Sequence, residues 1–273
     1  MSTLKAGVIG YPIHHSKSPI IHGHWIEEYD LTGTYETIEI APENLKEDIQ
    51  KLVDQGFHGF NATIPHKENI MALCDEVDET AKAIGAVNTI LIKDRKLFGS
   101  NTDVFGFIQN IKQEVPHFDF KNKRAVVLGA GGAARAIVYA FKQEDVSEII
   151  ITNRTREKAE SLIELAPDQV RIIDWELREY ALKGSDLLVN TTSLGMEGQL
   201  ALELDLTQLP THALVNDIVY TPLMTDLLSD AKAQGNDIVT GIGMLLHQAR
   251  PAFEKWTGIL PDVDDALIKK VLS

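Results

Sequence analysis

The sequence predicts an α/β protein with two domains. Short β-branched runs alternate with helical segments along nearly the whole chain of 273 residues, and such alternation is typical of sheets covered by helices. This length is sufficient for two modest domains, each with its own core. From about Arg124 the alternation becomes more regular, which indicates that a second domain begins near that residue.

In the first half, turn and capping residues bound most of the expected elements. Ser18 followed by Pro19 predicts a helix with Ser18 as its N-cap and proline at its first position. Apolar residues spaced three and four apart over 45–53 predict an amphipathic helix that ends at Gly56. Pro65 is expected to open a further helix. The expected strands are Lys5–Gly10, Thr34–Ile40, Phe57–Ile64 and, as a hairpin or paired strands, Val87–Ile92 and Lys96–Gly99.

The second half predicts a parallel sheet wrapped by helices. The segment 105–112 is the expected linker helix, and residues 241–273 are expected to be helical and able to pack back on the first domain. Residues 1–103 with 240–273 would therefore form one domain, and 104–239 the other. The expected strands are Arg124–Leu128, Ile149–Thr152, Val170–Ile173, Leu187–Asn190 and Leu214–Ile218.

Composition and charge exclude several classes of function. The formal net charge of -14 argues against nonspecific binding to nucleic acid or to a membrane surface. No run approaches the roughly 18 apolar residues of a membrane span. The segment Met1–Lys5 leads directly into an apolar strand, so no signal peptide is expected and the cytoplasm is the predicted location. Monomer and homodimer both remain open.

Cysteine and histidine do not form a catalytic or metal-binding pattern. Cys74 is the single cysteine and is expected to be a buried, unreactive thiol. His22 and His24 are two residues apart, whereas helical metal ligands are spaced three or four apart, so no metal site is predicted. His66 is interpreted as a surface residue or as one that supports a neighbour.

A glycine-rich turn follows the strand expected at 124–128 and opens an alanine-rich helix. The residues are Gly129-Ala130-Gly131-Gly132-Ala133-Ala134, which form a G-x-G-x-x-A fingerprint in the required strand-to-helix context. Gly129 allows the tight turn, Gly131 lets the backbone approach a pyrophosphate, and Ala134 permits close packing of helix and strand. The pattern predicts a Rossmann-like, doubly wound dinucleotide-binding domain, although a strand-to-helix turn without a ligand would fit the glycines alone.

The residues about 20 positions further on indicate which dinucleotide binds. An acidic residue there would bind the ribose 2′-hydroxyl of NAD, but the strand at 149–152 runs into Asn153-Arg154-Thr155, with Lys158 one turn later. Arg154 can hold a 2′-phosphate through its planar fork, and the other three add charge and hydrogen bonds. The cluster favours NADP. The alternative is that Arg154 and Lys158 are ordinary solvated charges paired with Glu157 and Glu160.

Lys67 is a candidate acid–base residue in the segment Asn61–Lys67. If Pro65 begins a helix, Lys67 lies in its first turn, where the helix dipole disfavours the ammonium form and lowers its pKa. An exposed lysine that tolerates this position is the alternative. Polar residues at other element ends, including Asn88 and Asp103, make a site more plausible.

Motifs along nearly the whole chain resemble those of the shikimate dehydrogenase family, in that family's order. They are Gly7–Gly10, Ser16–Pro19, Asn61–Lys67, Gly85–Thr89, Asn101-Thr102-Asp103, Gly129–Ala134, Asn153-Arg154-Thr155, Asn190–Met196 and Gly241–Gln248. The resemblance implies an NADPH-dependent oxidoreductase of the shikimate pathway of aromatic amino acid biosynthesis. Its reaction would be the reversible reduction of 3-dehydroshikimate to shikimate, in a cleft between the two domains.

The resemblance also implies a role for individual residues. Lys67 would be the general acid in reduction, and Asp103 would form a catalytic pair with it. Ser16 and Ser18 would bind the substrate carboxylate. Thr63, Asn88 and Gln248 would bind the ring hydroxyls, with Tyr220 beside them, and Thr191, Ile218, Gly241 and Met244 would line the nicotinamide side.

Three other functions remain open at this stage. A quinate or dual-specificity relative using NAD would share the fold, but Arg154 argues against it. A ligand sensor without activity and an interaction protein with a vestigial fold are both disfavoured, because Lys67, Asp103 and Arg154 are all present.

Overall fold

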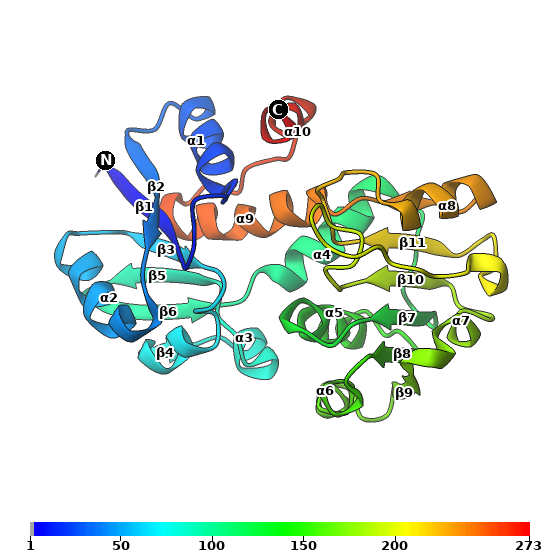
Figure 1. Ribbon diagram of the computed structural model, residues 1–273. Helices are drawn as coiled ribbons and strands as arrows, with labels where there is room; N and C mark the ends of the chain where they lie inside the picture. Colours follow the sequence, from blue (N-terminus) through cyan, green and yellow to red (C-terminus); the bar gives the residue numbers. More distant parts are fainter. Residues whose placement is uncertain (1–2) are drawn as a thin grey trace. The chain divides into compact units, whose positions relative to one another are not determined.

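The computed structural model describes residues 3–273 and divides the chain into two compact units (Figure 1). One unit extends to Thr102 and also takes in Leu246–Ser273, and the other is Asp103–Leu245. The sequence placed the corresponding boundaries after residue 103 and before residue 240. Each unit contains a six-stranded sheet.

The sheet of the first unit has the strand order β2-β1-β3-β5-β6-β4. Strands β2, β1 and β3 are parallel, whereas β5 is antiparallel to both β3 and β6. The expected hairpin is confirmed, with Asp94 and Arg95 as its two connecting residues at φ 49° and 64°. The strands are β1 (Leu4–Gly10), β2 (Gly33–Glu39), β3 (Gly59–Ala62), β4 (Glu76–Val77), β5 (Thr89–Lys93) and β6 (Lys96–Ser100).

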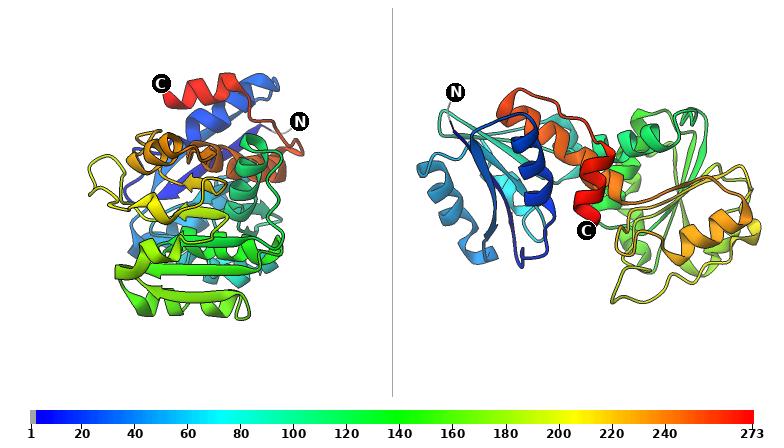
Figure 2. Two further views of the ribbon diagram at one scale, coloured as in Figure 1. Left: turned by 90° about the vertical axis from the view of Figure 1, so that its right-hand side faces the viewer. Right: turned by 90° about the horizontal axis from the view of Figure 1, so that it is seen from above.

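Helices cover this sheet, and the C-terminal helices belong to the same unit. Trp256 donates its indole N–H to the Ile90 carbonyl at 3.0 Å, directly over Gly59, where any Cβ would lie 2.1 Å from the Trp256 nitrogen. The C-terminal segment thus packs on the sheet of the first unit, and α10 lies beside α1 (Figures 1 and 2). The helices are α1 (Ser18–Glu28), α2 (Leu45–Asp54), α3 (Glu79–Ile84), α9 (Ile242–Thr257, from Leu246 in this unit) and α10 (Asp265–Leu272), with 3-10 turns at Pro42–Asn44 and Asn69–Leu73.

The sheet of the second unit is entirely parallel in the order β12-β11-β10-β7-β8-β9. Numbered within the unit, this order is the doubly wound arrangement that binds dinucleotides, with its switch point between β7 and β10. The strands are β7 (Arg124–Leu128), β8 (Glu148–Asn153), β9 (Val170–Asp174), β10 (Leu187–Asn190), β11 (Leu214–Asp217) and β12 (Ile238–Val239). The helices are α4 (Asp103–Glu114), α5 (Gly132–Gln143), α6 (Arg156–Glu160), α7 (Arg178–Ala181) and α8 (Asp226–Gln234), with 3-10 turns at Ile163–Leu165, Trp175–Leu177 and Leu206–Gln208.

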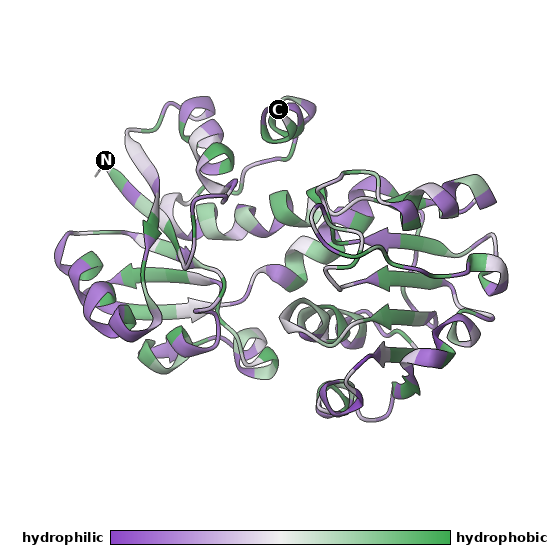
Figure 3. Cartoon of the chain, viewed as in Figure 1, coloured by the Kyte–Doolittle hydropathy of each residue, from purple (hydrophilic) through white to green (hydrophobic). Residues whose placement is uncertain are grey.

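Each unit has its own apolar core, and strands β7 and β10 of the second sheet are largely hydrophobic (Figure 3). In the first unit Ile9, Phe60 and Ile90 are fully buried, and in the second Val126 and Leu188 are. Both sheets are thereby rigid platforms for the loops at their edges. Among residues 3–273, no helix has the length and apolar character needed to cross a membrane.

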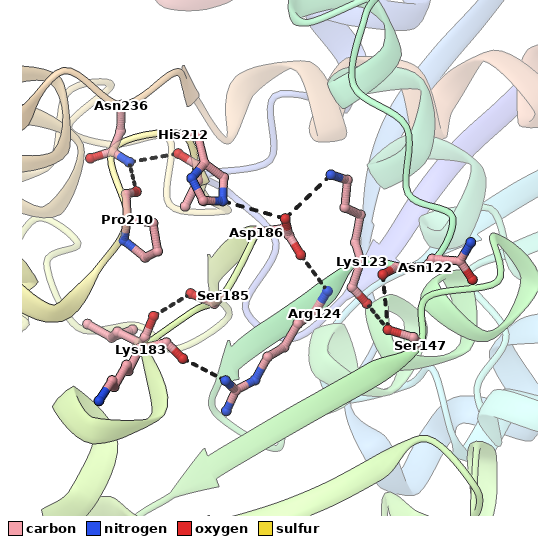
Figure 4. A network of polar contacts seen from close by, with 12 residues as sticks. Asn122, Lys123, Arg124, Ser147, Lys183, Ser185, Asp186, Pro210, His212 and Asn236 are labelled. Carbon is pink, nitrogen blue, oxygen red and sulfur yellow. Dashed lines mark hydrogen bonds and ion pairs between the residues drawn. The ribbon is translucent and has the colours of Figure 1, made fainter.

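A network of polar contacts joins the amino ends of β7 and β10 (Figure 4). The Asp186 carboxylate accepts a hydrogen bond from the backbone N–H of Arg124 at 2.9 Å, and Lys123 and His212 pair with it at 3.4 and 3.6 Å. Ser147 donates to the carbonyls of Asn122 and Lys123 nearby. These contacts are structural, because ligands of such sheets bind at the opposite, carboxyl ends of the strands.

Candidate active site

In the first unit, the loops after β1 and β3 lie against each other. Thr63 follows β3 and donates its backbone N–H to the Ile9 carbonyl at 3.0 Å. A Cβ on Gly10 would lie 2.8 Å from the Thr63 methyl group, so only glycine permits this approach. The loop after β1 contains Ser16 and leads into Ser18, so both serines follow the same end of the parallel pair β1 and β3 as Thr63 does.

The prediction that Ser18 caps α1 is wrong. Lys17 occupies the N-cap position without a side-chain cap, and Ser18 and Pro19 are the first two residues of the helix. The backbone N–H of Ser18 donates to the Ser16 hydroxyl oxygen at 3.3 Å. The Ser18 hydroxyl is thus not used for capping.

The prediction of a helix beginning at Pro65 is also wrong. Residues 65–68 form turns, and only a short 3-10 helix, Asn69–Leu73, follows. Lys67 therefore does not lie in the first turn of an α-helix, and the argument from the helix dipole does not apply to it. The backbone at Lys67 is instead held by a contact that is distant in sequence. The Lys67 carbonyl accepts a hydrogen bond from the backbone N–H of Val87, the residue before Asn88, at 2.8 Å.

Asn88 is almost fully buried, at 2% exposure, and its amide is fixed by three donors. Its Oδ1 accepts hydrogen bonds from the Thr102 N–H at 2.9 Å and from the hydroxyls of Thr102 and Thr89 at 3.1 Å each. Thr89 is the first residue of β5 and Thr102 follows β6, so the hairpin sets the orientation of this side chain. The first unit therefore brings Ser16, Ser18, Thr63, Lys67 and Asn88 to neighbouring loops at one edge of its sheet.

Two of the buried histidines of this unit, His22 and His66, serve its packing. His66 is fully buried and its Nε2 lies 2.7 Å from the Ile40 carbonyl, so the surface interpretation of this residue is wrong. His22 stacks on Tyr35 with ring centroids 4.1 Å apart, and burial lowers its pKa to about 3. Cys74 is half-buried, and burial raises its pKa to about 11, so its thiol is unreactive at neutral pH. Among residues 3–273 there is no group of three or more side chains suited to a metal ion.

In the second unit, the glycine-rich turn leaves β7 and opens α5 as predicted. Gly129 has φ +104°, and a Cβ there would lie 2.7 Å from the Thr191 hydroxyl. Gly131 is the N-cap of α5 without a side-chain cap, and a Cβ on Gly131 or Gly132 would meet no atom within 4 Å. The first N–H groups of the helix thus face open space, where a pyrophosphate fits. Ala130 and Ala133 complete the turn, and Ala134 is fully buried against the sheet.

The basic residues after β8 are positioned for a phosphate. Asn153 closes the turn by donating its amide to the Thr155 carbonyl at 2.8 Å, and Arg154, Thr155 and Lys158 are exposed. The alternative in which Arg154 and Lys158 pair with neighbouring glutamates is wrong, because Glu160 forms its ion pair with Arg156 at 2.8 Å. Arg156 also pairs with Asp174, whereas within residues 3–273 neither Arg154 nor Lys158 forms an ion pair. These residues suit the 2′-phosphate of NADP.

The loops after β10 and β11 are tied together by a carboxylate that sequence reasoning missed. Asp217, at the end of β11, accepts hydrogen bonds from Asn190 at 3.0 Å, from the Val219 N–H at 3.0 Å and from Thr225 at 2.8 Å. Burial raises the pKa of Asp217 to about 6, although the three hydrogen bonds act to lower it. The available signal was a single acidic residue at the end of the apolar run 214–218.

These loops carry most of the residues expected on the nicotinamide side. Thr191 donates its hydroxyl to the Leu128 carbonyl at 2.7 Å, beside the glycine turn. Ile218 lies against Gly241, where a Cβ would be 2.3 Å from the Ile218 carbonyl oxygen. Tyr220 follows in the same loop, and burial raises its pKa. Met244 is the third residue of α9.

Asp103 and Gln248 are the remaining predicted residues, and they belong to different units. Asp103 is the first residue of α4 in the second unit, directly after Thr102. Gln248 is on the part of α9 that belongs to the first unit. Both lie within a few residues of the points where the chain passes from one unit to the other.

Comparisons with known proteins agree with this arrangement. The chain matches the families described as shikimate dehydrogenase substrate binding domain over residues 8–90, shikimate / quinate 5-dehydrogenase over 110–221, and shikimate 5′-dehydrogenase C-terminal domain over 241–267. It is 50% identical over 269 residues to a shikimate dehydrogenase (NADP(+)) of Paramagnetospirillum magneticum, covering 98% of each chain.

Solved structures are similar along the whole chain. Shikimate 5-dehydrogenase of Thermus thermophilus, in complex with NADP(H) and shikimate, has a TM-score of 0.89 at 36% identity, with 99% of each chain covered. Quinate dehydrogenase of Corynebacterium glutamicum, in complex with NAD, has a TM-score of 0.92 at 30% identity, again with 99% of each chain covered. The glycine turn, the parallel sheet and these matches together establish that the chain belongs to the shikimate dehydrogenase family.

Proposed function

We propose that this protein catalyses the reversible, NADPH-dependent reduction of 3-dehydroshikimate to shikimate, a step of aromatic amino acid biosynthesis. The observation that carries the proposal is the arrangement of groups at the edge of the second unit where the cofactor would bind. There the uncapped N-terminus of α5 and the exposed Arg154 suit NADP, in a chain with a relative of 50% identity that is named for this activity and cofactor. The first unit would be the substrate domain and the second the NADP domain.

The hydroxyl groups of Ser16 and Ser18 would hold the substrate carboxylate. A neutral hydroxyl donates a charge-assisted hydrogen bond to a carboxylate without placing a cation in the site. This matters in a protein whose net charge is -14, because the local donors must offset a repulsive long-range field. Thr63, Asn88 and Gln248 would orient the ring through its hydroxyls, with Tyr220 nearby.

Lys67 and Asp103 would carry the proton transfer. Lys67 would donate a proton to the carbonyl oxygen during reduction and accept it in the reverse direction, as a general acid–base residue. Asp103 would orient the ammonium group and contact the same oxygen. NADPH, when bound, supplies the hydride for the ring carbon. Asp217 would hold the loops after β10 and β11, so that Thr191, Ile218, Gly241 and Met244 form a fixed surface for the nicotinamide.

We also propose that the protein acts in the cytoplasm as a monomer or homodimer, on small molecules and not on nucleic acid or a membrane. The acidic charge and the single unreactive cysteine support this. Sedimentation equilibrium at catalytic concentration distinguishes monomer from dimer.

The decisive experiment follows absorbance at 340 nm while the purified protein oxidises shikimate or quinate with NADP or NAD. We expect rapid reduction of NADP with shikimate and much slower reaction in the other three combinations. Preference for NAD or quinate would assign the protein to the quinate or dual-specificity branch. No turnover with any pair would reject an oxidoreductase and favour a ligand sensor.

A further inference from the structure

Two buried asparagine side chains hold the turn that leads from β12 into α9 in the second unit. Strand β12 lies at the edge of the sheet and has only two residues, so backbone pairing fixes little of the chain that follows it. The amide of Asn216 donates to the Val239 carbonyl at 3.0 Å, and the amide of Asn110 donates to the next carbonyl, that of Thr240, at 2.9 Å. Both asparagines are almost fully buried, at 1% and 2% exposure.

The Asn110 amide has a single possible orientation in this turn. The Thr240 carbonyl can only accept a hydrogen bond, so the Asn110 amide nitrogen faces it and the amide oxygen is turned towards Gly243. A Cβ on Gly243 would overlap that oxygen, and its three nearest atoms outside the local helix would all belong to Asn110. Glycine at position 243 therefore makes room for this one amide.

Helix α4 links the same amide to the carboxylate expected to take part in catalysis. Asp103 is the first residue of α4, and Asn110 follows seven residues later. Residues seven apart lie on one face of an α-helix, separated by about 10 Å along its axis. Between them, Phe107 is fully buried and packs edge-on against Phe141 of α5 with ring centroids 5.4 Å apart, which fixes the helix to the unit. Asp103 and the turn after β12 are thus held by one helix.

The turn also carries backbone expected on the nicotinamide side. Gly241 lies against the carbonyl oxygens of Ile218 and Val219, with no room for a Cβ, and Met244 follows directly after Gly243. A shift of the Thr240 carbonyl would therefore move two of the expected nicotinamide contacts. Hydride transfer requires the reacting atoms to lie about 3–3.5 Å apart, and a misplacement of about 1 Å lowers the rate on the order of 100-fold.

We propose that Asn110 is a positioning residue for hydride transfer, which fixes the turn 240–243 relative to Asp103. The inference rests on the proposed function. Asn110 is itself buried and acts through the backbone that it holds. With the amide in place, the nicotinamide and the carboxylate of Asp103 keep one spacing. Without it the turn can move, while the rest of NADP stays bound at the loops after β7 and β8. The loss should therefore appear in kcat and not in KM.

The test is Asn110→Ala, with Asn236→Ala as the matched control. Asn236 is a buried asparagine of the same unit whose amide also donates to backbone carbonyls, those of Pro210 and Ala213 at 2.8 Å each, but at the amino ends of the strands (Figure 4). Both substitutions should lower the melting temperature, because each leaves buried carbonyls without a donor.

Only Asn110→Ala should lower kcat, by about 10- to 100-fold, with the KM values for shikimate and NADP within about threefold of wild type. The isotope effect on kcat with NADPH deuterated at the transferred position should rise, because hydride transfer becomes rate-limiting. Wild-type kcat in Asn110→Ala would overturn the inference. An equal loss of kcat in Asn236→Ala would also overturn it, since general destabilisation would then explain both.

Gly243→Ala tests the same contact from the opposite side. Its methyl group would displace the Asn110 amide, so kcat should fall as in Asn110→Ala. In the Asn110→Ala background the methyl group has room, and Gly243→Ala should change kcat by no more than about twofold. Losses that multiply in the double variant would contradict the inference. Absence of turnover in the wild-type protein would instead reject the proposed function, whereas normal wild-type turnover with any of the contrary results above rejects this role alone.

Discussion

Arg154 and Arg156 are two residues apart at the end of β8, yet their surroundings differ. Arg156 is held by Asp174 and Glu160, which raise its pKa further. Arg154 is exposed and has no such carboxylate partner within residues 3–273. A guanidinium already paired with two acids is a poor phosphate ligand, so of these two arginines it is Arg154 that can distinguish NADP from NAD.

We therefore predict that Arg154→Gln raises the KM for NADP roughly 10- to 100-fold, the cost of losing charge-assisted hydrogen bonds to a phosphate. The KM for NAD should change little, because NAD lacks the 2′-phosphate. Steady-state kinetics with both cofactors measure the ratio. Arg156→Gln is the matched control and should leave the ratio unchanged; an equal effect of the two substitutions would contradict the assignment.

Lys67 is the residue on which the proposed chemistry depends. Lys67→Ala should lower kcat by about 10²- to 10⁴-fold, the usual contribution of a general acid–base residue. NADPH affinity, measured by quenching of protein fluorescence, should stay near the wild-type value. Lys93→Ala removes an exposed lysine of the same unit and is the control. Near-normal turnover of the Lys67 variant would refute its role.

At the scale of elements, the turn between β7 and α5 uses its glycines for two different purposes. Gly129 has a positive φ and is enclosed by Thr191 and Thr192, so it is required by the fold itself. Gly131 has φ -88°, and its missing Cβ faces open space. The absence of a side chain at Gly131 is therefore useful only when another molecule approaches the backbone.

This difference predicts opposite results for two alanine substitutions. Gly129→Ala should destabilise the protein by about 1–3 kcal/mol through backbone strain and the clash with Thr191. Gly131→Ala should leave the melting temperature within about 2 °C of wild type while weakening NADP binding at least tenfold. Thermal unfolding and calorimetric titration with NADP measure the two effects. A Gly131→Ala protein with normal NADP affinity would argue against a pyrophosphate at this turn.

At the scale of the whole molecule, the two units are expected to respond to acid in opposite ways. Burial lowers the pKa of His22 to about 3 and that of His247 to about 4, and both belong to the first unit. Their unfolded forms bind protons below about pH 6.5 while the folded forms do not, so stability is lost as pH falls below that value. Asp217 of the second unit has a raised pKa of about 6, so its burial penalty is relieved as pH falls from 6 towards 4.

We predict that the stability of the first unit falls between pH 7.5 and pH 5.0, with His22 contributing about 2 kcal/mol of the loss. Over the same interval, Asp217 should stabilise the second unit by about 1 kcal/mol. His22→Phe should keep the aromatic stacking and reduce the acid-dependent loss of stability by the part that His22 contributes. Urea unfolding at the two pH values measures it, and the exposed His117→Phe is the control. An unchanged pH dependence in His22→Phe would show that burial of His22 is not the cause of the loss.

Sequence patterns were most informative where a single local rule decides the structure. The strands Arg124–Leu128 and Leu187–Asn190 were predicted to the residue, because a short apolar run bounded by turns has few alternatives in an α/β fold. They were least informative at Ser18 and Pro65. Proline is tolerated at the start of a helix but does not compel one, and at Pro65 contacts with Val87 and Ile40 prevail over local preference.

By itself, the sequence determined the fold class, the dinucleotide turn and the chemical types of the candidate residues, since these depend on local periodicity and on side-chain identity. Only the tertiary structure decided which polar groups meet. Asn61 and Asp217 gain their partners from segments that are distant in sequence and adjacent in the sheet. Hydrogen-bond direction and burial, and the pKa shifts that burial causes, depend on that adjacency. No local pattern contains this information, because it arises only when the strands pair.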